Sequence, residues 1–255
     1  MEGRTKQEEG PGPSSFPLPP SPGRGVEVGA IVVAAGSGAR MGGVDKLFAP
    51  LAGRPLLAHT LAAFAACPAV DRLVLVLSSA SLERGRALLD EVAPGRGWRV
   101  CAGGARRQDS VRLGLAALGA CEWVAVHDGA RPLVTPELIR GGLEAACETG
   151  AAVPAVPLAD TVKEAGPDGL VVRTLDRSRL YAVQTPQVFR YDLFFRAHRE
   201  VTAGVTDDAA MLEALGLPVK LFPGDRNNIK VTTPEDMRFV EALLKTEPQP
   251  VTHDP

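Results

Sequence analysis

Short apolar runs alternate with amphipathic stretches through the middle of the chain, and this alternation constrains the fold more than any other feature. The apolar runs have the length of buried strands, and the stretches between them have helical spacing. The pattern predicts a three-layer α/β fold with a Rossmann-like, mostly parallel sheet covered by helices on both faces. The expected strands are residues 28–35, 72–78, 122–127 and 151–157, and the expected helices are residues 55–66, 80–91, 107–118 and 135–148.

Residues 158–190 interrupt this alternation. Between Asp160 and Asp176 the sequence reads as two short strands around a Gly-Pro-Asp-Gly turn. We therefore expect a β-arm at about residues 158–178 that protrudes from the domain. Because a lone two-stranded arm is barely stable in water, one hypothesis is that it joins two copies of the chain in a homodimer. The alternative is that the arm only flanks the functional site.

The two ends of the chain differ from its middle in composition. The first residues hold six prolines together with Gly and Ser, and they offer almost nothing to bury. We expect a disordered extension at residues 1–26, one folded domain at residues 27–246, and a flexible tail at residues 247–255.

Composition excludes several kinds of partner. The net charge is −2 and aromatic residues make up 5%, which argues against nucleic acid and anionic membranes as binding partners.

The chain has neither an apolar run long enough to span a bilayer nor a hydrophobic signal core, so we expect a cytoplasmic protein. The four cysteines lack the spacing of a zinc site, and we expect free thiols.

A glycine-containing loop, residues 34–38, follows the first expected strand. Its small residues let backbone N–H groups approach an anion closely. Met41 occupies the place of the third glycine of a dinucleotide fingerprint, and the Gly-Lys-Ser/Thr of a Walker A loop is missing. The two cations that follow, Arg40 and Lys46, suit a triphosphate, whose leaving group gains charge during transfer. The alternative is a plain strand-to-helix turn with solvated charges.

Four motifs in sequence order carry a resemblance to a known family. The first, similar to the signature of GT-A-like nucleotidyltransferases, is Ala34-Ala35-Gly36-x-Gly38-x-Arg40-Met41 followed by a lysine. The others are Val126-His127-Asp128-Gly129-Ala130-Arg131-Pro132, Gln184-Thr185-Pro186-Gln187 and Asn228-Ile229-Lys230-Val231-Thr232. Together they resemble the 2-C-methyl-D-erythritol 4-phosphate cytidylyltransferases of the non-mevalonate isoprenoid pathway, over residues 28–245. The resemblance implies Mg²⁺-dependent transfer of CMP from CTP to that polyol phosphate, giving 4-diphosphocytidyl-2-C-methyl-D-erythritol and pyrophosphate.

The resemblance also assigns a nucleotide site. It implies that Ser110 and the backbone beside it read the cytosine edge. The alternative is a plain helix N-terminus with Asp109 or Ser110 in its first turn. Asp128, at the carboxyl end of an expected strand, is expected either to orient Mg²⁺ carried by the triphosphate or to bind the ribose region. The implied nucleotide-binding residues are Ala34, Ala35, Gly36, Ser37, Gly38, Gly103, Gly104, Ser110, Asp128 and Gly129.

The same resemblance implies a polyol phosphate site completed across a dimer. No general base is needed, because the attacking phosphate is already ionised at neutral pH. Three residues have alternatives: Arg131 as a structural partner of a carboxylate, Thr206 as a helix N-cap, and His127 as a core imidazole rather than a catalyst. The implied catalytic residues are Arg40, Lys46, Arg177 and Lys230, and the implied substrate-binding residues are Asp160, Thr161, Thr206 and Arg131.

Three rival functions share some of these features. Ribitol 5-phosphate cytidylyltransferases share the glycine loop and most of the motifs, and the two polyols differ so little that selectivity of only about 1–3 kcal/mol is expected. An NAD-dependent dehydrogenase would need a glycine in place of Met41 and an acidic residue about 20 positions past the loop. A sugar-phosphate binding module would not need four placed cations.

Overall fold

The computed structural model of the chain describes residues 27–36 and 46–246. The longer strands of its central sheet fall on short apolar runs that contain several Val residues, whose branched side chains suit a pleated, buried surface. The strands are β1 (Val28–Ala34), β2 (Pro50–Leu51), β3 (Arg54–Pro55), β4 (Arg72–Leu77), β5 (Arg99–Ala102), β6 (Trp123–Asp128), β7 (Ala151–Pro157), β8 (Lys163–Ala165), β9 (Val171–Thr174), β10 (Tyr181–Val183), β11 (Gln187–Arg190) and β12 (Lys220–Pro223).

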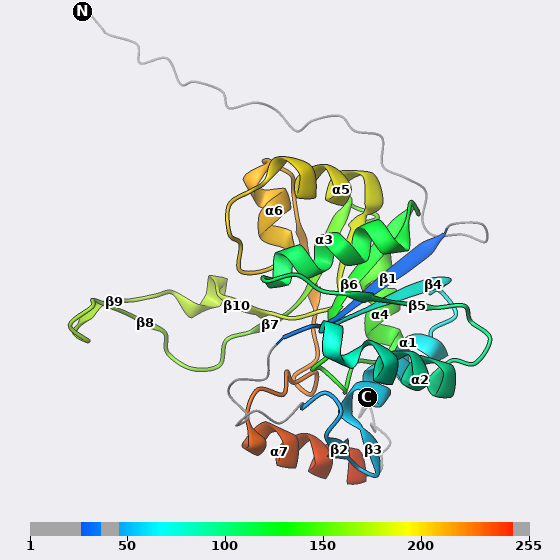
Figure 1. The fold of residues 1–255 in the computed structure, drawn as a ribbon. Coiled ribbons are helices and arrows are strands. Elements are labelled where there is room, and N and C mark those ends of the chain that lie inside the picture. The colour runs from blue at the N-terminus through cyan, green and yellow to red at the C-terminus, as the bar shows by residue number, and fades with distance from the viewer. Residues whose placement is uncertain (1–26, 37–45, 247–255) are drawn as a thin grey trace, which may run out of the picture.

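The central sheet runs in the order β10-β7-β11-β6-β1-β4-β5, with β12 paired to β7 (Figure 1). Strand β1 lies between β4 and β6 and is parallel to both, while β5 continues the parallel arrangement beyond β4. Strand β11 is inserted antiparallel between β6 and β7. The sheet is therefore mixed but mostly parallel, and the predicted α/β fold class is confirmed.

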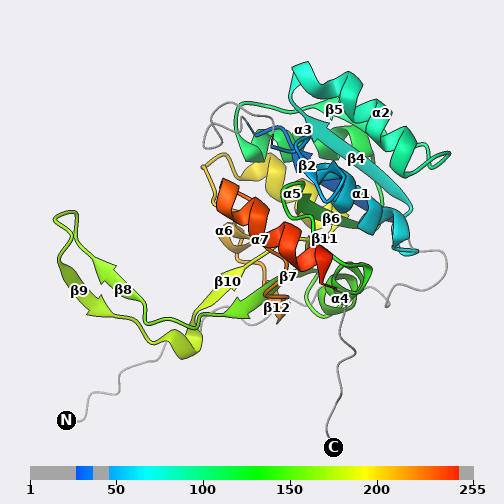
Figure 2. The same cartoon turned by 90° about the horizontal axis from the view of Figure 1, so that it is seen from below.

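Helices cover both faces of this sheet (Figures 1 and 2). Because successive side chains of a strand point to opposite faces, Ala30 and Val32 of β1 join the core on one side and Ile31 joins the core on the other. The first face is covered by α1 (Leu56–Ala66), α2 (Leu82–Val92), α4 (Pro136–Ala146) and α7 (Pro234–Lys245); the second by α3 (Arg107–Leu118), α5 (Tyr191–Glu200) and α6 (Ala209–Ala214).

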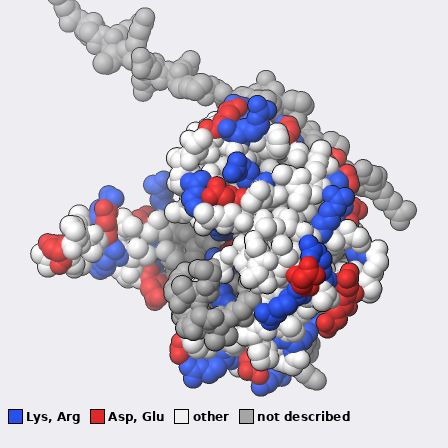
Figure 3. Space-filling model, viewed as in Figure 1, with Lys and Arg blue, Asp and Glu red and all other residues white. Residues whose placement is uncertain are grey.

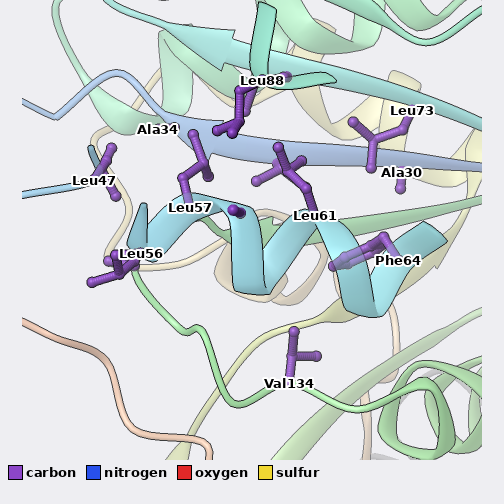
Figure 4. Packing of buried hydrophobic residues seen from close by; sticks show 14 of the residues in the cluster. Ala30, Ala34, Leu47, Leu56, Leu57, Leu61, Phe64, Leu73, Leu88 and Val134 are labelled. Atoms are coloured by element: carbon purple, nitrogen blue, oxygen red, sulfur yellow. The ribbon is translucent and has the colours of Figure 1, made fainter. Parts of the chain in front are cut away.

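Helix α1 shows how the first core is built (Figure 4). Leu57, Leu61 and Phe64 are fully buried along it, and they face the side chains of β1 and β4. Burying each such side chain contributes roughly 1.5–3 kcal/mol. This packing fixes the position of β1, whose carboxyl end leads into the glycine loop.

A hairpin of β8 and β9 reaches away from the sheet (Figure 2). Its turn is closed by a hydrogen bond from Gly169 N to Gly166 O of 3.0 Å, and Gly169 has a φ of +80°, which favours glycine. Three consecutive apolar residues of the hairpin are largely exposed, namely Leu170, Val171 and Val172.

Several sequence predictions lie outside the described residues: the N-terminal extension, the C-terminal tail, and Ser37, Gly38 and Arg40 of the glycine loop. Within residues 27–36 and 46–246, the structure has no helix that is both long and apolar enough to cross a bilayer. Figure 3 shows Lys and Arg interspersed with Asp and Glu over the visible face.

Candidate active site

The carboxyl ends of four adjacent parallel strands form one edge of the sheet. Register places Ala34 beside Leu77, Leu77 beside Ala102, and Asp128 of β6 beside Val33. Ligands of open α/β folds bind outside this edge. The glycine loop, the Gly103-Gly104 segment and the Asp128-Gly129 segment therefore leave the sheet at neighbouring points.

Gly103 shows how closely two of these segments approach. A Cβ built at Gly103 would lie 2.4 Å from the Cβ of Ala35, which no side chain tolerates. The backbone of Gly103 is also tied to the sheet through a 2.8 Å hydrogen bond from its N–H to the carbonyl of Leu77. The structure thus brings the predicted loops at residues 34–36 and 103–104 into direct contact.

Ser110 is buried in the first turn of α3. Its Oγ accepts a 3.1 Å hydrogen bond from Gly104 N and lies 3.1 Å from the carbonyl of Arg106, to which it donates. Asp109 and Arg106 cap the same turn. These contacts give Ser110 a structural role in shaping the loop, and base recognition by its side chain stays a prediction.

Gly129 packs against the end of β1. Its N–H donates to Val33 O over 2.9 Å, and a Cβ there would lie 3.2 Å from the Cβ of Ala34. Thr60 of α1 donates to the Gly129 carbonyl over 3.1 Å. A bare backbone at this position keeps β6 and β1 close at the edge where the nucleotide is expected.

Asp128 is the centre of a cluster of charges. Lys230 Nζ lies 2.7 Å from its Oδ2, and Arg107 Nε lies 3.0 Å from its Oδ1. The Nη1 of Arg107 in turn lies 2.8 Å from Oδ2 of Asp208. Two cations and two carboxylates, drawn from four separate parts of the sequence, therefore alternate across the strand ends.

Burial and charge together set the protonation of this cluster. Burial by itself would raise the pKa of Asp128, but the charges of Arg107 and Lys230 outweigh it and hold that pKa well below its usual range. Burial also raises the pKa of Asp208, and Arg107 opposes this effect. For Arg107, the two carboxylates overcome burial and raise its pKa. Opposite charges therefore favour the ionised forms of Asp128 and Arg107, whereas burial is the larger effect on Asp208 and leaves its pKa raised.

Lys46 and Arg131 meet the segment that carries Lys230. The Nζ of Lys46 donates to Val231 O over 2.8 Å, and Nη1 of Arg131 donates to Asn228 O over 2.7 Å. The alternative role for Arg131 was a structural one, pairing with a carboxylate. Among the described residues, its side chain instead donates to this backbone carbonyl. Two cations predicted from distant motifs are thus brought together, because Lys46 contacts the short segment that carries Lys230.

His127 is a buried structural residue. Its Nδ1 is 3.1 Å from Thr185 Oγ1 and its Nε2 is 3.2 Å from Arg131 O. Burial lowers its pKa to about 4, so the ring is neutral near pH 7. The interpretation of His127 as a satisfied core imidazole fits these contacts, which join the 127–131 segment to the motif around Thr185.

The remaining predicted residues lie elsewhere in this chain. Asp160, Thr161 and Arg177 are exposed at the base of the hairpin, where Arg177 donates to the carbonyl of Ala159. Across the described residues, the structure records no hydrogen bond or ion pair from them to Asp128 or Lys230. Thr206 is exposed, and the N-cap position of α6 is Asp208, so the alternative of Thr206 as an N-cap is wrong.

Two members of the charge cluster, Arg107 and Asp208, were not among the predicted residues. Arg107 had a visible signal: residues 107, 111, 114 and 118 share one face of α3, and the last three are buried against the sheet. A charged residue on that apolar stripe, at the ligand-binding end of the sheet, needs a partner. Asp208 carried no comparable signal in a short polar segment.

The side chains at the site indicate how a metal ion would be held. Within the part of the chain that the structure describes, no group of three or more His, Cys, Asp or Glu side chains is arranged to bind one. Both oxygens of Asp128 already contact cations. These residues fit a Mg²⁺ ion that is bound mainly by substrate phosphates, as is usual for this ion, rather than one held in a protein cage.

Comparisons with known proteins agree on one family. Residues 28–246 match the family model described as 2-C-methyl-D-erythritol 4-phosphate cytidylyltransferase. A protein of that name from Dehalococcoides mccartyi is 53% identical over 219 residues, which cover 86% of this chain and 96% of that protein. One from Symbiobacterium thermophilum is 47% identical over 227 residues, which cover 87% and 94%.

Solved structures lead to the same group. A 4-diphosphocytidyl-2C-methyl-D-erythritol synthase from Anaerococcus prevotii superimposes with a TM-score of 0.77 at 31% identity, covering 87% of this chain and 99% of that one. A 2-C-methyl-D-erythritol 4-phosphate cytidylyltransferase from Thermus thermophilus does so with a TM-score of 0.69 at 34% identity, covering 85% and 98%. The likeness therefore extends over the whole described domain.

Proposed function

The chain belongs to the 2-C-methyl-D-erythritol 4-phosphate cytidylyltransferase family, and we infer from this that it is a nucleotidyltransferase that moves CMP from CTP to 2-C-methyl-D-erythritol 4-phosphate. The product, 4-diphosphocytidyl-2-C-methyl-D-erythritol, is an intermediate of isoprenoid precursor synthesis. Because CTP is made and used inside the cell, we expect the enzyme to act in the cytoplasm.

The reaction requires little covalent chemistry from the protein. A phosphate oxygen of the polyol phosphate forms a bond to the α-phosphorus of CTP, and the bond between that phosphorus and the bridging oxygen of pyrophosphate breaks. The attacking phosphate is largely ionised at pH 7, since its second pKa is about 6, so no general base is required. What remains is to align two polyanions and to balance the charge that grows on the leaving group.

The observation that carries the proposed residue roles is the group of cations at the strand ends. Lys230 contacts Asp128, and Lys46 contacts the backbone beside Lys230. We assign Lys46, with Arg40 from outside the described residues, to the triphosphate and the pyrophosphate that leaves. Lys230 is assigned to the phosphate of the polyol, with Arg177 supplied by a second copy of the chain.

Mg²⁺ is proposed as the required ion. When bound, it would neutralise phosphate charge and favour departure of pyrophosphate. The residues placed to meet it are those around Asp128, whose carboxylate orients Lys230 and faces the expected phosphates. The role of Asp128 as a direct Mg²⁺ ligand stays a prediction.

We further propose that the hairpin of β8 and β9 joins two copies of the chain. Exposed apolar side chains on an isolated hairpin mark a contact surface. Val172→Glu should convert a dimer at micromolar concentration into a monomer, measured by light scattering, because the charge would be buried in the contact. Leu113→Glu, at another exposed apolar position on α3, should leave the dimer intact. A wild-type monomer at that concentration would exclude the proposed dimer.

The transfer itself is tested by identifying the product. Wild-type protein incubated with CTP, the polyol phosphate and Mg²⁺ should yield a compound whose mass equals that of the polyol phosphate plus CMP minus water. Excess chelator should abolish the yield, and UTP or ATP should replace CTP poorly. Product formed equally well in chelator would contradict the role of Mg²⁺, and failure to form it at all would contradict the function.

A further inference from the structure

Asp208 lies just ahead of α6, in the same segment as Thr206, with 1% of its surface exposed. Its carboxylate pairs with Arg107, Oδ2 to Nη1, over 2.8 Å. Burying a carboxylate this completely is strongly unfavourable without such a partner. The pairing therefore ties the connection between α5 and α6 to the first residue of α3.

Arg107 is shared between two carboxylates. Its Nη1 forms an ion pair with Asp208, while its Nε donates to Oδ1 of Asp128 over 3.0 Å. A guanidinium group is better suited to bind both oxygens of one carboxylate with two parallel N–H groups. Here Asp208 holds the guanidinium in place, so that Arg107 contacts Asp128 through Oδ1 of that carboxylate. The other oxygen, Oδ2, accepts from Lys230 over 2.7 Å.

We propose that Asp208 is a positioning residue of the transfer reaction: it holds one end of Arg107, keeps the other end on a single oxygen of Asp128, and reserves the second oxygen for Lys230. The proposal rests on the function assigned to Lys230, which is to bind the phosphate of the polyol. Asp208 acts on that phosphate only through Arg107, Asp128 and Lys230.

Removing the charge of Asp208 should rearrange the cluster. Arg107 then turns its two-nitrogen edge onto Asp128 and takes both carboxylate oxygens. Lys230 loses its partner, and its ammonium group is no longer fixed where the polyol phosphate binds. Phosphate binding weakens although no residue that touches the substrate has been changed.

The contact is tested directly by NMR of the lysine ammonium groups in the full chain. The chain has only six lysines, so the Lys230 signal can be assigned by its loss in Lys230→Met. We expect Asp208→Asn to shift or broaden that signal, because its hydrogen bond to Asp128 is lost. The matched control is Asp207→Asn. Asp207 contacts Gln187 Nε2 over 2.8 Å and Ala210 N over 3.1 Å rather than Arg107, so its replacement should leave the signal unchanged.

A rescue variant separates positioning from a general loss of structure. Adding Arg107→Lys to Asp208→Asn should restore the Lys230 signal, because an ammonium group lacks the two-pronged edge that competes for Asp128. A signal unchanged in Asp208→Asn, changed equally in Asp207→Asn, or not restored by Arg107→Lys would overturn the proposal.

Kinetics complete the test. In Asp208→Asn, KM for the polyol phosphate should rise about 10-fold while KM for CTP stays within about twofold, as expected when one charged contact is lost. Equal rises in both constants would contradict positioning through Lys230. If the wild-type protein does not transfer CMP at all, the proposed function fails, yet the NMR result still decides whether Asp208 controls the contact of Lys230.

Discussion

Replacing Lys46 by alanine is expected to lower kcat for cytidylyl transfer by about 100-fold or more. Loss of one preorganised donor to a developing charge typically costs a factor of about 10² to 10³ in kcat. Lys46 is positioned by its 2.8 Å bond to Val231 O, beside the strand ends where the triphosphate is proposed to bind. Because the charge on departing pyrophosphate grows as the reaction proceeds, the loss should appear in kcat more than in KM for CTP.

The measurement is steady-state pyrophosphate release by the purified variant. Lys220→Ala is the matched control. Lys220 is an exposed lysine that pairs with Glu148, and it begins β12, which lies beside β7 on the side away from β6. It should retain wild-type turnover. A Lys46→Ala enzyme within about threefold of wild type would refute the role assigned to Lys46.

Replacing Lys230 by methionine is the second change with a large expected effect. Methionine keeps much of the side-chain length but removes the ammonium group that contacts Asp128 over 2.7 Å. Losing a charged contact to phosphate costs about 1.5–3 kcal/mol, which corresponds to roughly 10- to 100-fold in binding. We expect KM for the polyol phosphate to rise by that factor, and KM for CTP to rise much less.

Arg177 provides a second test of the same division of labour. Arg177→Met should also raise KM for the polyol phosphate selectively if a second copy of the chain supplies this side chain. Arg179→Met, in the same short turn, is the control and should behave as wild type. Both KM values changing alike in Lys230→Met and Arg177→Met would show that these residues do not separate the two substrates.

The long elements of the fold were predictable because their sequence patterns are complete. Strands β1, β4, β6 and β7 consist mostly of buried apolar residues, and each lies within a residue or two of its predicted range. Helix α4 was marked at its start by Thr135, whose side chain accepts from Leu138 N, and by Pro136. The family resemblance, which rests on motifs at the ends of such elements, is confirmed.

Short elements escaped prediction because their pairing depends on distant partners. Strand β11 has four residues and includes Gln187 and Arg190, and it is a strand because β6 and β7 flank it. Helix α2 begins at Leu82 rather than at residue 80, since Ser79–Ser81 form a 3₁₀ turn ahead of it. Local sequence carries little information about either feature.

The residues of the candidate site also differ in how far the sequence could predict them. Lys46, Asp128 and Lys230 sit in motifs that could be recognised one at a time, and the fold brings them together. The pairing of Arg107 with Asp208 joins residues about a hundred positions apart, and no local pattern records such a contact. A charge on the buried stripe of α3 was the single visible hint, and it identified a residue in need of a partner without identifying the partner.

The most direct test of the proposed function is a comparison of two polyol phosphates as acceptors of CMP. Pyrophosphate release should be measured with CTP and Mg²⁺ and with either 2-C-methyl-D-erythritol 4-phosphate or ribitol 5-phosphate, each over a range of concentrations. The proposed function predicts a kcat/KM at least about tenfold higher for the methylerythritol compound, the scale that a methyl-sized difference supports. A higher kcat/KM for ribitol 5-phosphate, or pyrophosphate release that is independent of either acceptor, would contradict it.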